Sequence, residues 1–116
     1  MNDDLKFRIK KALRTVAKQK TVISYRMLAI EAEIPGPQAI HKLTLCLEEI
    51  FQDDHLKGDI SLAPLAVSRG EPVIPRPGFF ILLQKLDLYH GAEQGPEAIA
   101  KHHSLLQEIY NTISEK

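Results

Sequence analysis

A short segment rich in proline and glycine, between two helical patterns, is the feature that most restricts the fold. It reads IPGP, at residues 34–37. A residue before proline avoids the helical conformation, and glycine permits a sharp turn. Ser24 is suited to cap a helix over residues 25–33, and a proline is suited to begin the next helix, predicted over residues 37–55. Two helices joined by such a turn form the outline of a helix-turn-helix.

Helices and short strands are predicted on either side of this unit. Apolar residues recur at helical spacing in residues 1–20, and the β-branched run at residues 21–23 predicts an extended segment. Residues 60–68 predict a strand, in which Pro64 marks an edge or a break because proline cannot donate to a ladder. Two more helices are predicted, over residues 79–89 and 96–114.

A stiff loop follows the second predicted strand. Residues 69–78 hold three prolines and two glycines, which predicts a restricted and irregular backbone. A helix-turn-helix followed by a strand and such a loop describes a winged helix, with this loop as the wing. The predicted fold is therefore a single, mainly α domain with a small β component, winged helix-turn-helix-like, over residues 1–116. Its parts are a basic N-terminal helix (1–20), a helix-turn-helix core with a strand (21–70), a proline-rich wing-like loop (71–78) and C-terminal helices (79–116).

Composition and charge exclude several classes of protein. No apolar run approaches ~18 residues, so no transmembrane helix is predicted, and the charged N-terminus does not resemble a signal peptide. The single cysteine excludes an internal disulfide, and we expect a cytoplasmic protein. Net charge is zero, yet residues 1–20 hold seven Lys and Arg against two Asp. We interpret this first helix as a solvated basic face, so the basic character expected of a nucleic-acid binder is local.

The start of the predicted recognition helix carries groups suited to nucleic acid. In a DNA-reading helix-turn-helix, the second helix presents its first exposed residues to base edges in the major groove. Glutamine can bond adenine in a bidentate manner, and lysine reaches guanine or phosphate. Loop arginines are suited to clamp a phosphate backbone. The candidate contacts are Gln38, His41 and Lys42 on the helix, with Arg69 and Arg76 flanking the proline-rich loop.

An acidic run opposes this interpretation. Carboxylates repel the phosphate backbone, and four of them follow on the same helix: Glu48, Glu49, Asp53 and Asp54. Two interpretations therefore stay open. Either the first turns of the helix read DNA, or the helix-turn-helix serves only for packing and presents a solvated acidic face. The position of the acidic run relative to the groove-facing surface discriminates between them.

The segment ISYRMLA, residues 23–29, resembles the C-terminal domain of the alkylguanine DNA alkyltransferases and the alkyltransferase-like proteins. These families carry a V-x-S-Y-x-x-L-A start, a G-x-P turn, a recognition helix and a P-C-H-R-V segment. The resemblance runs from about residue 21 to residue 70. It implies a winged-helix scaffold that binds DNA, and it adds Tyr25 to the candidate contacts. The positions that match are Ser24, Tyr25, Leu28, Ala29, Gly36 and Pro37.

The chain departs from this pattern at the segment that would carry catalysis. Leu65, Ala66 and Val67 stand where the family has Cys, His and Arg, and the recognition helix has no arginine to act as a base-flipping finger. The resemblance therefore implies the scaffold and not alkyl transfer. Residues 65–80 also resemble an uncharacterised group of small bacterial proteins with an L-V-V-x-x…G-x-P-x-x-G-F-F signature, which implies no known activity but indicates that the loop before Phe79 is a defined feature.

Nothing in the sequence favours an enzyme. There is no phosphate-binding loop, no dinucleotide fingerprint and no nucleophile elbow. Cys46 lies between apolar residues, as a structural thiol does. His102 and His103 are adjacent, whereas helical metal ligands favour spacings of three or four, so we interpret them as surface histidines. We therefore expect no catalytic residue, no metal site and no cofactor.

The leading hypothesis is a small non-enzymatic protein that binds nucleic acid, with double-stranded DNA as the candidate partner. The alternative is a protein–protein interaction module on the same scaffold with no DNA role. The last helix offers an apolar side to a homodimer, although packing on its own core is the interpretation we favour. The residues of that side are Ile99, Leu106, Ile109 and Ile113.

Overall fold

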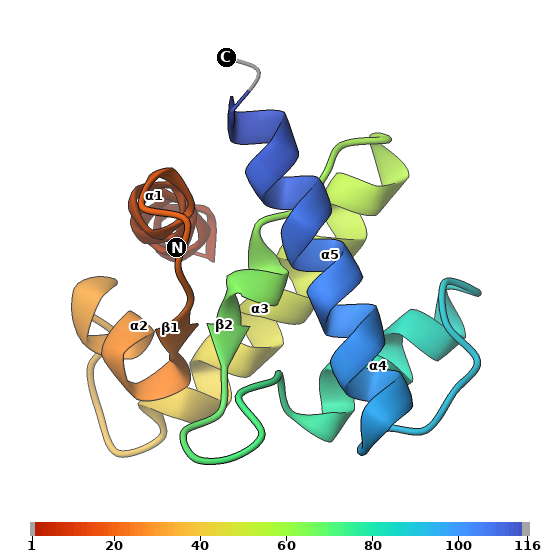
Figure 1. The fold of residues 1–116 in the computed structure, drawn as a ribbon. Coiled ribbons are helices and arrows are strands. Elements are labelled where there is room, and N and C mark those ends of the chain that lie inside the picture. Colours follow the sequence, from red (N-terminus) through yellow and green to blue (C-terminus); the bar gives the residue numbers. More distant parts are fainter. Residues whose placement is uncertain (1, 115–116) are drawn as a thin grey trace.

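The computed structural model describes residues 2–114, and side chains over residues 4–113. It confirms a mainly helical fold with a small β component (Figure 1). Long helices surround a minimal two-stranded sheet. In chain order the elements are α1 (Asn2–Lys18), β1 (Ile23–Ser24), α2 (Tyr25–Glu31), α3 (Ala39–Leu56), a 3-10 helix η1 (Ala63–Leu65), β2 (Ala66–Val67), α4 (Pro77–Lys85) and α5 (Pro96–Ser114).

The sheet consists of two parallel two-residue strands. Ile23 pairs with Ala66 and Ser24 with Val67, so the strands lie side by side between α2 and α5 (Figure 1). The predicted strand over residues 60–68 is therefore wrong in length. Pro64 lies in the first turn of η1, where its missing N–H costs nothing, and the Ser61 hydroxyl accepts from the amide of Ala63 at 3.2 Å. In the predicted wing-like loop over residues 71–78, residues 71–76 form no strand, and Pro77 and Gly78 already belong to α4.

The two helices of the predicted helix-turn-helix, α2 and α3, are present in the predicted order with shifted boundaries. Ser24 caps α2 as predicted, because its hydroxyl accepts from the amide of Met27 at 3.1 Å. The helix ends at Glu31, and Gly36 in the turn has a φ of 93°. The next helix begins at residue 39 rather than at Pro37, which lies in the turn. Gln38 occupies the cap position of α3 and makes no side-chain capping bond.

The fourth helix begins and ends earlier than the predicted range of 79–89. Pro77 occupies its first turn, where a proline is favoured. Asp87 adopts a left-handed φ of 61°, and the amide of Leu88 bonds the carbonyl of Leu83 at 2.8 Å, so the helix cannot continue. The last helix has the predicted bounds.

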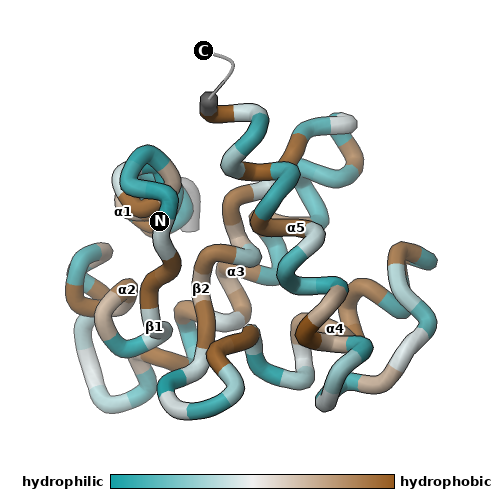
Figure 2. The backbone as a smooth tube through the Cα atoms, viewed as in Figure 1, coloured by the Kyte–Doolittle hydropathy of each residue, from teal (hydrophilic) through white to brown (hydrophobic). Residues whose placement is uncertain are grey.

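One core joins all of these elements, and the apolar segments converge on it (Figure 2). Fully buried side chains come from every layer: Leu13, Leu28, Leu43, Leu65 and Phe80. The last helix packs on this core, as favoured above, because Ile109 is buried and Leu106 and Ile113 lie against the cluster. Only Ile99, among the four residues considered for a homodimer, remains exposed.

His102 is a correction to the interpretation of surface histidines. It is 3% exposed, and its Nε2–H donates to the carbonyl oxygen of Pro64 at 2.8 Å. This bond connects α5 to η1. Burial lowers the pKa of His102; the bond to Pro64 acts in the opposite direction, and the neighbouring His103 adds to the lowering.

Because the imidazole of His102 is buried, we expect the free energy of unfolding to fall in mild acid. Unfolded chains bind a proton at His102 near pH ~6.5, whereas the folded protein resists it. The contribution of His102 is therefore fully present above pH ~6.5 and decreases as the pH falls below that value. Thermal unfolding at pH values on either side of 6.5 should show a smaller difference in His102→Gln than in the parent. His55→Gln, which removes an exposed imidazole, should keep the parent's difference; an equal pH dependence in all three would contradict the assignment.

We expect any side chain at Gly36, in the turn between α2 and α3, to lower the free energy of unfolding. Its φ of 93° is unfavourable for L-residues, so Gly36→Ala should destabilise the protein by about 1–2 kcal/mol. Gly78→Ala is the matched control, because Gly78 has no positive φ and lies in the first turn of α4. That variant should be neutral or slightly stabilising in urea denaturation. Equal stability of the two variants would show that the turn tolerates alanine.

Candidate nucleic-acid interface

An open groove lies between α2 and the start of α3. Its volume is about 740 Å³, and it brings together three of the predicted contacts, Gln38, His41 and Arg76, although Arg76 is far away in sequence. Arg26 of α2 also lines it. The remaining walls are apolar: Ala29, Ile30, Ile34, Pro37, Ala39 and Ile40. We call this surface the α2–α3 groove.

Two predicted contacts lie outside the groove lining. Lys42 is exposed on α3, and its ammonium lies near the turn, 3.6 Å from the position that a Cβ on Gly36 would take. It is therefore at the edge of the same surface. Arg69 is exposed in the loop after β2 and does not line the groove. The structure thus gathers Gln38, His41 and Arg76, with Lys42 beside them.

Tyr25 holds the arginine that completes the groove. Its side chain is buried, and its hydroxyl accepts from the backbone amide of Arg76 at 2.9 Å. The guanidinium of Arg76 lies over the ring, 5.1 Å from its centroid. Burial raises the pKa of the Tyr25 phenol, while the bond from Arg76 and its charge lower it. The tyrosine therefore positions Arg76 through both backbone and side chain.

A single-atom change tests this positioning. Tyr25→Phe removes the acceptor and leaves the amide of Arg76 without its partner, which should cost about 1–2 kcal/mol of unfolding free energy. Tyr110→Phe is the control, since its hydroxyl donates to the carbonyl of Thr21 at an exposed site. Hydrogen exchange at Arg76 should accelerate in Tyr25→Phe alone. An unchanged exchange rate would show that the loop is held by other contacts.

A smaller cavity adjoins the groove on the other side of Arg76. It has a volume of about 150 Å³, and Tyr25 and Arg76 line it. Arg76 also lines the α2–α3 groove. Thr44 and Glu48 of α3 contribute the other polar groups. Glu48 is thus the member of the acidic run that lies close to the candidate interface.

The rest of the acidic run is directed at α1. Lys6 pairs with Asp53 at 3.2 Å and with Glu49 at 3.8 Å, and Lys10 lies 3.8 Å from Asp54. The basic first helix is therefore more than the solvated face that its sequence indicates. Its lysines offset the carboxylates of α3, because the two helices pack together with opposite charges facing. The acidic run consequently does not flank the α2–α3 groove, apart from Glu48.

The two positions considered for a reactive thiol are buried. Leu65, which stands at the cysteine position of the alkyltransferase pattern, is fully buried in η1. Cys46 is buried, and burial together with Glu49 raises the pKa of its thiol. Within residues 4–113 no cluster of three or more His, Cys, Asp or Glu side chains is arranged to hold a metal ion.

Sequence reasoning missed Arg26. It directly follows Tyr25, and its exposed position on the first turn of α2 is the signal that would have indicated it.

No family model, curated protein or solved structure matches this chain. In the described part of the chain, no helix combines the length and apolar character required to cross a bilayer.

Proposed function

We propose that this protein binds double-stranded DNA, with the start of α3 in the major groove and without catalysing a reaction. The observation that supports this most is the composition of the α2–α3 groove. Its described lining contains two arginines, a glutamine and a histidine, and none of its residues is a carboxylate. A surface of this kind attracts phosphates and can hydrogen-bond base edges.

Each polar group has a role in this proposal. Gln38 and His41 lie at the first turn of α3, where they face base edges. Gln38 makes no capping bond, so the first amides of α3 stay available to a phosphate. Arg26 and Arg76 both line the groove, where they contact the phosphate backbone of the DNA. The alkyltransferase-like pattern at residues 23–29 supports the same orientation of the scaffold.

A salt titration of duplex binding tests the proposal. Fluorescence anisotropy with a labelled mixed-sequence duplex should show binding at low salt and a steep loss of affinity as salt rises, because each phosphate contact releases counterions. With three or four phosphate contacts, the slope of log K against log salt should be about −3 to −4. Absence of binding at low salt, where the attraction is strongest, would reject a DNA role.

A protein partner is the second candidate function, and the apolar wall of the groove favours it. Ile30 lines the groove and is 59% exposed, and Met27 on the same helix is 47% exposed. DNA gains little from such side chains, whereas a protein partner would bury them. Ile30→Gln separates the two: duplex affinity should change little if DNA is the partner, while a protein contact centred on α2 would be lost.

A further inference from the structure

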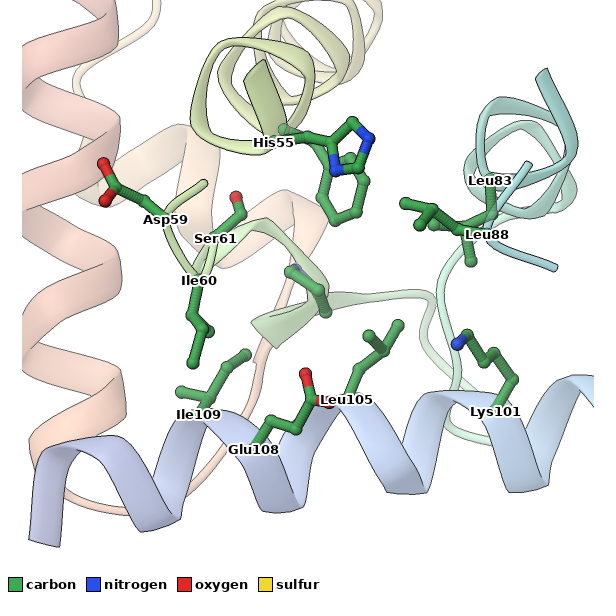
Figure 3. A pocket seen from close by; sticks show the side chains of 12 residues that line it. His55, Asp59, Ile60, Ser61, Leu83, Leu88, Lys101, Leu105, Glu108 and Ile109 are labelled. Atoms are coloured by element: carbon green, nitrogen blue, oxygen red, sulfur yellow. The ribbon is translucent and has the colours of Figure 1, made fainter. Parts of the chain in front are cut away.

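A further pocket, distinct from the α2–α3 groove, lies on the other helices of the fold (Figure 3). It is a cavity of about 210 Å³ between the C-terminal half of α3, η1, α4 and α5. We call it the α3–α5 cavity. Its apolar lining comprises Phe51, Ile60, Pro64, Leu83, Leu88, Leu105 and Ile109, and its polar lining comprises His55, Asp59, Ser61, Lys101 and Glu108.

Lys101 is the notable group of this cavity. It is partly buried, and its side chain extends from α5 toward Leu88 and the interior (Figure 3). Among the described residues 4–113, no carboxylate lies within ion-pair distance of its ammonium, unlike those of Lys6 and Lys10. Burying an ammonium group beside apolar side chains costs less free energy when an anion pairs with it. The cavity therefore places an ammonium group, which can pair with an anion, beside a hydrophobic surface.

The acidic groups of the lining lie away from this ammonium. Glu108 is two turns further along α5, a rise of about 10 Å, and it is exposed, so solvent screens it. Asp59 is directed toward α1 and away from the cavity (Figure 3). His55 of α3 lies across the cavity from α5, and its ring can donate a hydrogen bond (Figure 3). Lys101 and His55 therefore supply the cavity lining with groups that can pair with an anion.

We propose that the α3–α5 cavity binds a small monocarboxylate with an apolar body. The carboxylate pairs with Lys101, and the body packs against Leu83, Leu88 and Leu105. The volume limits the body to about one ring or a short branched chain, because cavities for drug-sized ligands are typically ~300–1,000 Å³. This inference is independent of DNA binding, because none of its residues lines the α2–α3 groove.

Isosteric probes on the full chain test the proposal. Amide chemical shifts would be followed by NMR during titration with 3-phenylpropionate, 3-phenylpropanol and 3-phenylpropylamine at matched ionic strength. The carboxylate should shift resonances around Leu83, Lys101 and Leu105, and the alcohol should bind about tenfold more weakly, as expected on losing a charge-assisted hydrogen bond. The amine should bind no better than the alcohol. Equal binding of all three, or no shift with the carboxylate up to its solubility limit, would overturn the proposal.

Variants at one position separate charge from packing. Lys101→Met should lower affinity for 3-phenylpropionate by about tenfold, because the apolar stem stays and the charge is lost. Lys101→Arg keeps the charge and should retain binding. Lys85→Met, at the exposed end of α4, is the matched control and should behave as the parent. An affinity of Lys101→Met equal to that of the parent would show that the ammonium takes no part.

Discussion

Charge reversal at Lys42 and Arg76 together is expected to abolish duplex binding. Both residues lie at the α2–α3 surface, one beside the turn and the other in the groove lining. Each replacement by glutamate removes a phosphate contact and adds a repulsive charge. Losing two contacts alone should reduce the salt slope by about 2, and the new carboxylates should lower the affinity further. Anisotropy titrations at several salt concentrations measure both quantities.

A matched control separates local contact from net charge. Lys57→Glu with Lys85→Glu changes the net charge by the same amount, but these lysines follow α3 and end α4, away from the groove. This pair should retain most of the affinity. An equal loss in both double variants would indicate attraction by overall charge, and an unchanged affinity in Lys42→Glu/Arg76→Glu would reject these residues as contacts.

Phe80→Ala is expected to destabilise the fold more than any other change considered. Phe80 is 0% exposed and lies in a run of rings, 5.6 Å from Phe79 and 5.8 Å from Tyr89 between centroids. Truncation removes the ring and leaves a cavity, which typically costs about 3–5 kcal/mol. Because small domains have ~5–15 kcal/mol in total, a large fraction of the chains should unfold at low urea concentrations.

Phe7→Ala provides the comparison for the same chemical change. Phe7 is 58% exposed on α1, so its removal should cost less than about 1 kcal/mol. Urea denaturation followed by circular dichroism gives both free energies. Similar values for the two variants would mean that Phe80 contributes no more to the core than a surface ring.

The order of elements could be predicted from local patterns, whereas their ends could not. Ser24 was identified as a cap because a hydroxyl before a helix has one dominant role, and the structure confirms it. The sequence predicts that α3 begins at Pro37, yet proline also suits a turn, and Pro37 lies in one here. The strand over residues 60–68 was too long because η1 depends on tertiary packing around Pro64.

The sequence predicts only those residues of the candidate site whose role follows from their position in one helix. Gln38 and His41 follow from their positions at the start of a recognition helix. The approach of Arg76 to Tyr25 joins residues far apart in the chain, and no periodicity indicates such a contact. The pairing of Lys6 with Asp53 is of the same kind, and so is the burial of His102. Each of these contacts depends on which helices pack together, and local sequence patterns do not determine that packing.

The short parallel ladder also decides how separable the helix-turn-helix is. The strands join residue 23 to residue 66, so α2, α3 and η1 lie within one closed stretch of the chain. A fragment that begins after β1 or ends before β2 lacks one of the two strands and leaves the backbone groups of the other unpaired. The helix-turn-helix is therefore not a module that can be transplanted by itself. Any graft onto another scaffold would have to carry both strands.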